Sequence, residues 1–269
     1  MSKSELNAAQ LRKRAEQREQ RGGLGEAAPL YLQAAAALAH ENRHADAASM
    51  LQAALDRDER RAKTSAQQPR ELRRALADAL AASRQIGAAI SEYEEYLKAG
   101  APDAGTLTTL ADLYVAAGKP NLAVERLRRA IERAVSDSDV RSAAAAAERV
   151  AGLLPDSADA AAEHVALLRA ASAGGARLVR ALEHLAELHR REERISHETA
   201  VLREVLALAP GNEAVRQRLA NLYTQILEND PNDEEAWNGL RSTDPDLSEQ
   251  MTVLLMDEHT SERNRSKAG

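Results

Sequence analysis

Phenylalanine is absent from the 269-residue sequence, and aromatic residues make up only 2% of it. Compact β-rich cores rely on aromatic and β-branched side chains, so this shortage argues against a β fold. Hydrophobic residues still reach 44%, and alanine, leucine and valine supply most of them. The composition therefore favours helices that pack closely through small side chains.

Cysteine is also absent. Its absence excludes disulfides, thiolate metal ligands and a cysteine nucleophile, and it suits a reducing compartment. No stretch approaches the roughly 18 apolar residues of a membrane span, and the opening residues lack the apolar run of a secretory signal. We therefore expect a cytoplasmic protein without membrane insertion. The alanine- and arginine-rich composition also suggests a bacterial source.

Motifs for catalysis and metal binding are missing too. The seven histidines include no HExxH pair, and a helix break at 42–43 separates His40 from His44. The glycines at 22–25 follow no strand and precede no Lys-Ser or Lys-Thr, so they form neither a phosphate loop nor a dinucleotide fingerprint. No Gly-x-Ser-x-Gly elbow occurs. We therefore expect no enzyme activity, no cofactor and no metal.

What the sequence does contain is helical periodicity. Leu72, Leu76 and Leu80 recur every fourth residue, whereas apolar/polar alternation typical of strands is nearly absent. Turn-forming residues interrupt the pattern, which predicts helices of about 11 to 18 residues joined by short loops. The expected breaks lie at 22–23, 42–43, 67–69, 100–102, 118–120, 136–138, 155, 174–175, 210–211, 231 and 245.

The helices repeat. Leu76 and Ala77 recur 34 residues later as Leu110 and Ala111. The pentapeptide LAELH, which begins at Leu185, recurs after the same interval as LANLY. A fixed period of this length is typical of a solenoid, in which each unit buries its apolar face against its neighbour.

The chain resembles the tetratricopeptide-repeat (TPR) family over roughly residues 25–256. The family unit is a helix-turn-helix with small residues at roughly positions 8, 20 and 27 and larger ones at roughly 4, 7, 11 and 24. The residues that match it are Tyr31, Ala34, Ala35, Leu38, Ala47, Leu51 and Ala54; Leu76, Ala77, Leu80, Ala89, Tyr93 and Tyr96; Leu107, Leu110, Ala111, Tyr114, Ala123, Leu127 and Ala130; Leu182, Leu185, Ala186, His189, Leu202, Val205 and Pro210; and Trp237 and Leu240.

The resemblance implies an all-α, right-handed α-solenoid of antiparallel helix-turn-helix repeats. It departs from the family pattern around 56–69, where the step between units is longer, and over 138–175, where the pattern is weak. We therefore expect the solenoid to be irregular in the middle and at the C-terminal end. Three parts are expected: a basic N-terminal helix within 1–24 that caps one end, the solenoid over 25–256, and a disordered polar tail over 257–269.

The resemblance also implies a groove, lined by the first helix of each unit, that holds a segment of another protein. Its lining residues in this chain are Arg74, Asp78, Thr108, Thr109, Asp112, Glu183, His184, Glu187, Arg190, Arg191, Gln217, Arg218, Asn221, Thr224 and Gln225. Family members that grip a C-terminal carboxylate carry lysine and asparagine in this groove, at places where this chain has other residues. A clamp of that kind is therefore not expected.

These observations favour a non-catalytic scaffold or adaptor that binds a protein or peptide segment. A structural or self-assembling subunit, forming a homo-oligomer, is the main alternative. An RNA-binding helical repeat is more distant, because the net charge is −6 and the groove mixes acids with bases. A basic cluster over 57–74 is interpreted either as a solvated loop and helix start or as a docking patch for an acidic partner.

Overall fold

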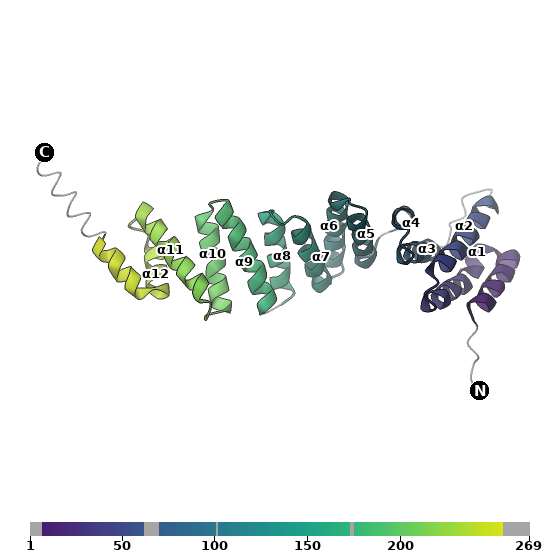
Figure 1. The fold of residues 1–269 in the computed structure, drawn as a ribbon, viewed down its shortest axis with the longest axis horizontal. Coiled ribbons are helices and arrows are strands. Elements are labelled where there is room, and N and C mark those ends of the chain that lie inside the picture. The colour runs from purple at the N-terminus through teal and green to yellow at the C-terminus, as the bar shows by residue number, and fades with distance from the viewer. Residues whose placement is uncertain (1–6, 62–69, 101, 173–174, 255–269) are drawn as a thin grey trace, which may run out of the picture. The chain divides into compact units, whose positions relative to one another are not determined.

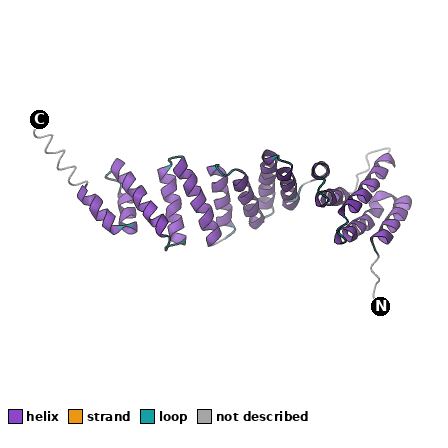
Figure 2. Ribbon diagram, in the orientation of Figure 1, coloured by secondary structure: helices purple, strands orange, loops and turns teal. Residues whose placement is uncertain are grey.

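The computed structural model describes residues 7–61, 70–100, 102–172 and 175–254, and every regular element in these ranges is an α-helix (Figures 1 and 2). Residues 245–254 form a helical segment after the last named helix. The expected all-α fold is confirmed. The named helices are α1 (Ala8–His40), α2 (His44–Arg61), α3 (Arg70–Ala82), α4 (Ile86–Lys98), α5 (Ala104–Ala116), α6 (Pro120–Ser136), α7 (Val140–Leu153), α8 (Ala158–Ala170), α9 (Ala176–Arg191), α10 (Ile195–Leu208), α11 (Glu213–Asn229) and α12 (Glu234–Thr243).

Consecutive helices pack as hairpins, most extensively α3 with α4, α5 with α6, and α9 with α10. Their contact faces are the positions of the repeat pattern. On α5 and α6, Leu110, Ala111, Ala123 and Leu127 are all fully buried. Alanine at the crossing points lets the helix axes approach, and leucine fills the space beside it. The TPR-like helix-turn-helix repeat is thus the architecture of the chain.

The chain divides into two compact units, residues 1–146 and 147–269. Unit 1 contains α1 to α6, unit 2 contains α8 to α12, and the division falls within α7. The division differs from the expected boundaries at 24 and 256, which remain predictions. The expected tail, 257–269, lies outside the described residues.

Helix starts follow the expected capping chemistry. The Asp103 side chain accepts a 2.8 Å hydrogen bond from the backbone N–H of Thr106 at the start of α5. Ser157, Asn212 and Asp233 cap α8, α11 and α12 in the same way. Each cap satisfies a backbone N–H that the helix itself leaves unpaired. These residues therefore fix where α5, α8, α11 and α12 begin.

Tight left-handed turns end several first helices. Gly118 has φ 70° after α5, and the next N–H, that of Lys119, donates to the Tyr114 carbonyl at 2.8 Å. Arg84 after α3 and Glu193 after α9 take the same conformation, with φ 63° and 55°. The breaks that they make were not expected from the sequence, because neither residue is a turn former. The repeat geometry imposes a conformation that glycine would adopt more easily.

The N-terminal part of α1 is a separate segment that is fixed by a buried charge. Gly23 has φ 81° and interrupts the helix, as the expected break at 22–23 requires. Before it, Glu19 is only 3% exposed. Its carboxylate accepts hydrogen bonds from the Tyr31 hydroxyl at 2.6 Å and from Nη2 of Arg57 at 2.9 Å. A buried carboxylate with two donors ties this segment to the first helix pair.

Candidate functional site

The predicted groove residues of unit 1 lie on α3 and α5. Thr109 and Asp112 are exposed on α5, and Thr108 is half-buried. The Thr108 hydroxyl donates to the Ala104 carbonyl at 2.8 Å, and the Thr109 hydroxyl donates to the Gly105 carbonyl at 3.1 Å. Both hydroxyl protons are therefore used inside the helix.

The α3 residues of this face also have partners within unit 1. Nη1 of Arg74 lies 3.7 Å from Oδ2 of Asp103, the residue that caps α5. Asp78 accepts a hydrogen bond from the Tyr93 hydroxyl on α4. The polar groups that the sequence pattern assigns to the groove here mainly join α3 to α4 and α5. They leave few free donors for a partner.

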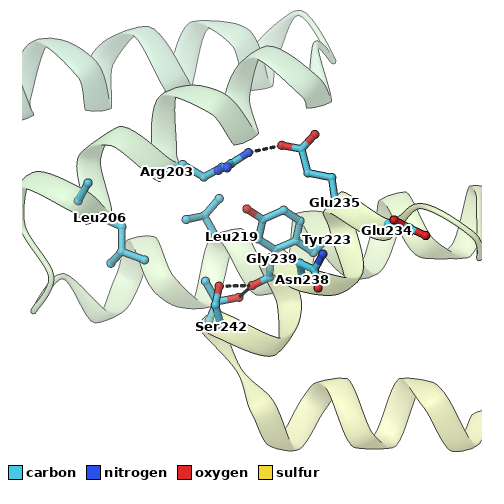
Figure 3. A pocket seen from close by; sticks show the side chains of 11 residues that line it. Arg203, Leu206, Leu219, Tyr223, Glu234, Glu235, Asn238, Gly239 and Ser242 are labelled. Carbon is cyan, nitrogen blue, oxygen red and sulfur yellow. Dashed lines mark hydrogen bonds and ion pairs between the residues drawn. The ribbon is translucent and has the colours of Figure 1, made fainter.

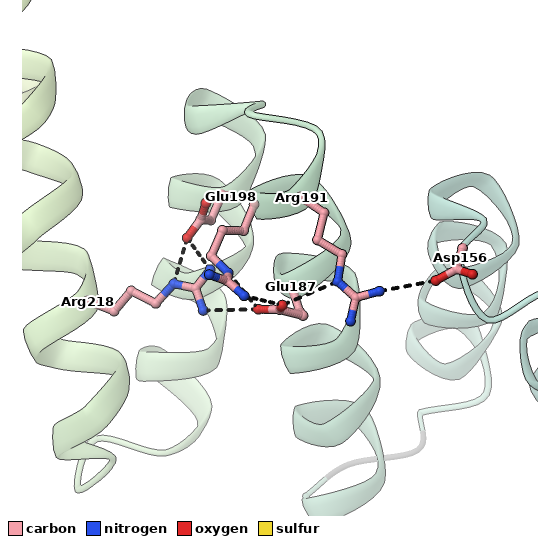
Figure 4. A network of polar contacts seen from close by, with 6 residues as sticks. Asp156, Glu187, Arg191, Glu198 and Arg218 are labelled. Atoms are coloured by element: carbon pink, nitrogen blue, oxygen red, sulfur yellow. Dashed lines mark hydrogen bonds and ion pairs between the residues drawn. The ribbon is translucent and has the colours of Figure 1, made fainter.

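In unit 2, Glu187 on α9 is the centre of a network of ion pairs (Figure 4). It pairs with Arg190 in its own helix, with Nε of Arg191 at 3.4 Å, and with Nη1 of Arg218 on α11 at 3.5 Å. The Arg190 hydrogen bond is the largest of the causes that lower the pKa of Glu187 to about 2. The carboxylate is therefore ionised over the whole physiological range.

The network continues beyond the predicted groove. Arg191 reaches Asp156 in the α7–α8 loop at 3.1 Å, and Nε of Arg218 donates to Glu198 on α10 at 2.6 Å (Figure 4). The structure thus brings together four predicted residues and adds Asp156 and Glu198. These arginines are already neutralised by acids, so they bind α9, α10, α11 and the α7–α8 loop to one another more than they attract an outside anion.

A stripe of unused amides lies on α11. Gln217, Asn221 and Gln225 are exposed and four residues apart, so they share one helix face. Among the described residues, none of their side chains makes a hydrogen bond. Nearby, Glu183 is engaged, because it accepts from Nδ2 of Asn212 at 3.0 Å. The stripe offers paired donors and acceptors of the kind that hold an extended backbone.

A pocket of about 290 Å³ lies between α7, α8 and α9. Glu148, His164, Arg177, Arg180 and His184 line it, together with alanine, glycine and proline. His184 is the member that the sequence pattern placed in the groove. Nη2 of Arg177 pairs with Glu148 at 2.7 Å, where both side chains are half exposed.

His164, which is half-buried, also lines this pocket. Its Nε2 atom is buried and has no hydrogen-bond partner among the described residues. Burial lowers the pKa of His164, and the positive charges of Arg177 and His184 lower it further, whereas Glu148 acts in the opposite direction. The imidazole is thus mostly neutral near pH 7 and keeps a polar atom unsatisfied.

A larger hollow, of about 730 Å³, lies between α10, α11 and α12 (Figure 3). Leu206, Leu219 and Tyr223 form its apolar part, and Arg203 pairs with Glu235 across it. None of these residues was among the predicted site residues. The hollow has one ion pair over an aromatic ring, and Glu234, which also lines it, is exposed and has no partner among the described residues. A single exposed carboxylate gives no indication of a specific ligand.

The described members of the basic cluster around 57–74 are mostly held within unit 1. Arg57 pairs with Glu19, and Arg73 pairs with Glu92 at 2.8 Å. The Arg70 guanidinium lies 4.0 Å from the centroid of the Tyr96 ring. Lys63 lies outside the described residues. These contacts favour a structural role for the cluster over a docking patch.

His189 stands where the repeat pattern usually has tyrosine, and it is buried, as that position requires. Its ring centroid lies 5.2 Å from that of His197 on α10. Burial is the main cause that lowers the pKa of His189, and His197 and Arg194 add to the effect. Within the described residues, no group of three or more histidine or acidic side chains is arranged to hold a metal ion.

Among the residues that the structure describes, no helix has both the length and the apolar character to span a membrane.

Of the charged and histidine residues that line the pocket between α7, α8 and α9, sequence reasoning predicted only one. It identified His184 from the repeat register but missed Arg180, one turn earlier on the same face, and His164 on α8. The α7–α8 pair fits the repeat pattern weakly, so its residues had no register from which to be assigned. The usable signal was the spacing of Arg180 and His184, four residues apart and therefore on one helix face.

Comparison with known proteins yields similarity of structure only. No family model matches the sequence, and no curated protein does. Among solved structures, YrrB, described as a TPR protein with an unusual peptide-binding site, is 16% identical, with 91% of this chain and 99% of that chain covered and a TM-score of 0.37. BtubC from P. vanneervenii is 14% identical, with 92% and 89% covered and a TM-score of 0.40.

The C-terminal part of a TPR repeat-containing protein from Cytophaga hutchinsonii is 11% identical, with 87% of this chain and 94% of that chain covered and a TM-score of 0.37. The repeat spacing, the buried repeat positions and the helix hairpins define the class. The chain therefore has a TPR-like helical-repeat fold.

Proposed function

We propose that the protein is a non-catalytic scaffold that holds an extended segment of another protein against the α9–α11 face of unit 2. The observation that supports this most directly is the stripe of Gln217, Asn221 and Gln225. Three exposed amides in register, whose side chains make no hydrogen bond with any described residue, match the donors and acceptors along an extended peptide backbone.

The surroundings of the stripe also suit this role. Glu187 and Arg218 hold α9 and α11 together beside it, so the amides lie on fixed helices and not on a loop. A rigid surface lowers the entropic cost of binding. In unit 1 the corresponding threonines are bonded to their own helix, so we place the main contact in unit 2. The cytoplasmic location and bacterial source remain predictions.

The test is selection from a displayed library of random linear peptides with the 269-residue chain. We expect peptides that bind with micromolar affinity, and we expect the variant Gln217→Ala/Asn221→Ala/Gln225→Ala to lose most of that affinity. A matched control, Gln17→Ala/Gln20→Ala/Gln250→Ala, removes three exposed amides elsewhere and should bind normally. The α9 arginines are less suitable targets, because replacing them breaks the Glu187 network.

Failure to enrich any peptide, or equal binding by both triple variants, would exclude this groove assignment. Light scattering of the same samples addresses the self-assembling alternative. A concentration-dependent rise in mass would favour a homo-oligomeric subunit. Retention of single-stranded RNA at low salt would instead favour the helical RNA-binding alternative, since such binding weakens steeply as salt rises.

A further inference from the structure

The pocket between α7, α8 and α9 has an unbalanced charge. Glu148 and Arg177 neutralise each other at its rim through a 2.7 Å ion pair. Arg180 lines the same pocket and is exposed. It makes no ion pair and no hydrogen bond with any described residue. The lining therefore carries one positive charge that no neighbouring carboxylate compensates.

Arg180 is unusual within unit 2. Residues 147–254 contain no lysine, and every other arginine of the part of this unit that the structure describes interacts with a neighbouring group. Most of those groups are carboxylates: Arg169 pairs with Glu204, and Arg203 pairs with Glu235. Within the described part of unit 2, Arg180 is therefore the arginine whose charge a partner would neutralise.

His164 supplies a second, independent sign of a ligand. Its Nε2 atom is buried and has no hydrogen-bond partner among the described residues, and a buried polar atom left unpaired costs free energy. An incoming group with oxygen acceptors would satisfy the Nε2–H tautomer. His184, exposed on the same helix face as Arg180, adds a further nitrogen-bearing side chain to the lining.

We propose that this pocket binds the side-chain carboxylate of an aspartate or glutamate in the partner segment, with Arg180 as the charged anchor and His164 as the buried donor. A planar guanidinium matches the two oxygens of a carboxylate. A volume of about 290 Å³ accommodates one such side chain. The proposal rests on the proposed function, and it names the feature of the bound segment that gives specificity.

The α11 amides and this pocket then have different tasks. Amides that bond a peptide backbone accept many sequences, whereas a single cationic pocket selects an acid at one place. A glutamine in that place would fill the same volume without the charge. It would leave Arg180 unpaired, and discrimination of this kind is worth roughly tenfold in affinity.

The experiment uses peptides selected by the 269-residue chain, synthesised with acetylated and amidated ends so that no terminal carboxylate contributes. We expect an Asp or Glu at one common position, and its replacement by Gln or Asn to weaken binding about tenfold. Arg180→Gln should weaken the acidic peptide to the same degree and leave the amide peptide unaffected. Arg129→Gln is the control, because Arg129 is exposed on α6 and also has no partner among the described residues.

Reversing the charge at position 180 tests whether the pocket recognises the charge of the bound side chain. Arg180→Glu should reject the acidic peptide and accept a peptide with lysine at that position. His164→Gln should weaken the acidic peptide, and circular dichroism establishes that each variant is folded. Selected peptides without a common acid, or acidic peptides that ignore Arg180, would overturn the proposal and leave the scaffold function standing. Failure to select any peptide would reject both.

Discussion

The ring of Tyr223 on α11 lies directly over Gly239 on α12 (Figure 3). A Cβ atom placed at 239 would overlap the ring at its Cζ and Cε atoms. Tyr223 is a repeat position and is buried, with the hydroxyl end of the side chain at the α10–α12 hollow. The short final hairpin of unit 2 therefore depends on a glycine that faces a tyrosine.

Gly239→Ala should destabilise unit 2, because the buried ring must move to admit a methyl group. Overpacking of this kind costs about 1 to 3 kcal/mol, which exceeds the gain in helix propensity of about 1 kcal/mol. Thermal unfolding followed by circular dichroism measures the change. Gly152→Ala on α7 is the control, since its Cβ meets nothing within 4 Å. Equal melting temperatures for the two variants would contradict the packing argument.

Glu19→Ala should destabilise unit 1 by about 2 to 3 kcal/mol, because it leaves Arg57 and the Tyr31 hydroxyl without their shared acceptor. The value lies at the low end for a broken buried pair, since the Arg57 side chain is about one-third exposed. Urea denaturation measures the free energy of unfolding. Glu16→Ala removes an exposed partner of Arg12 on the same helix and should change it by less than about 0.5 kcal/mol.

Arg84→Gly and Gly118→Ala should act in opposite directions. Both residues occupy the left-handed turn inside a repeat, with φ 63° and 70°. Glycine adopts this conformation freely, so we expect Arg84→Gly to stabilise unit 1 by about 0.5 to 1 kcal/mol and Gly118→Ala to destabilise it by about 1 kcal/mol. Chemical denaturation of the two variants checks both signs. If Arg84→Gly instead lowers the free energy of unfolding, the Arg84 side chain stabilises the fold by more than its left-handed backbone conformation destabilises it.

His189 should make unit 2 less stable in mild acid. Its pKa in the folded chain is lowered, chiefly by burial, whereas in the unfolded chain it is about 6.5. As the pH falls below about 6.5, His189 binds a proton in the unfolded chain before it does so in the folded chain. The free energy of unfolding therefore decreases as the pH falls from about 6.5 toward the pKa of the folded state. His189→Tyr should lose less stability than the wild type between pH 7.5 and pH 5.5. Urea titrations at the two pH values measure it, and identical losses would exclude His189 as a cause.

The sequence predicted the packing positions well, because each is set by a simple requirement. Ala111 and Ala123 must be small for helices to approach, and Leu110 and Leu127 must fill the adjacent space. These small and large positions recur after 34 residues, so the same packing requirement can be recognised in more than one unit. The turns at Arg84 and Glu193 were missed, since their conformation is imposed by the helices on either side and not by the residues themselves.

Site prediction from the sequence was less complete for a different reason. The repeat register says which side chains leave the buried face, but it does not say which of them are already paired. Arg191 and Arg180 look equivalent in the sequence, yet one reaches Asp156 and the other reaches nothing among the described residues. Pairing depends on Asp156 in the α7–α8 loop and on Glu198 of α10, and the register assigns neither of these residues to the groove.

Nearly all the strong helix contacts join helices that follow one another in the chain. Contacts of this local kind give a low contact order and rapid folding. During synthesis, α1 and α2 would pack before the later hairpins had left the ribosome, and each new hairpin of a unit would find its neighbour already folded. The nascent chain would thus expose only one short apolar face at a time, which limits its opportunity to aggregate.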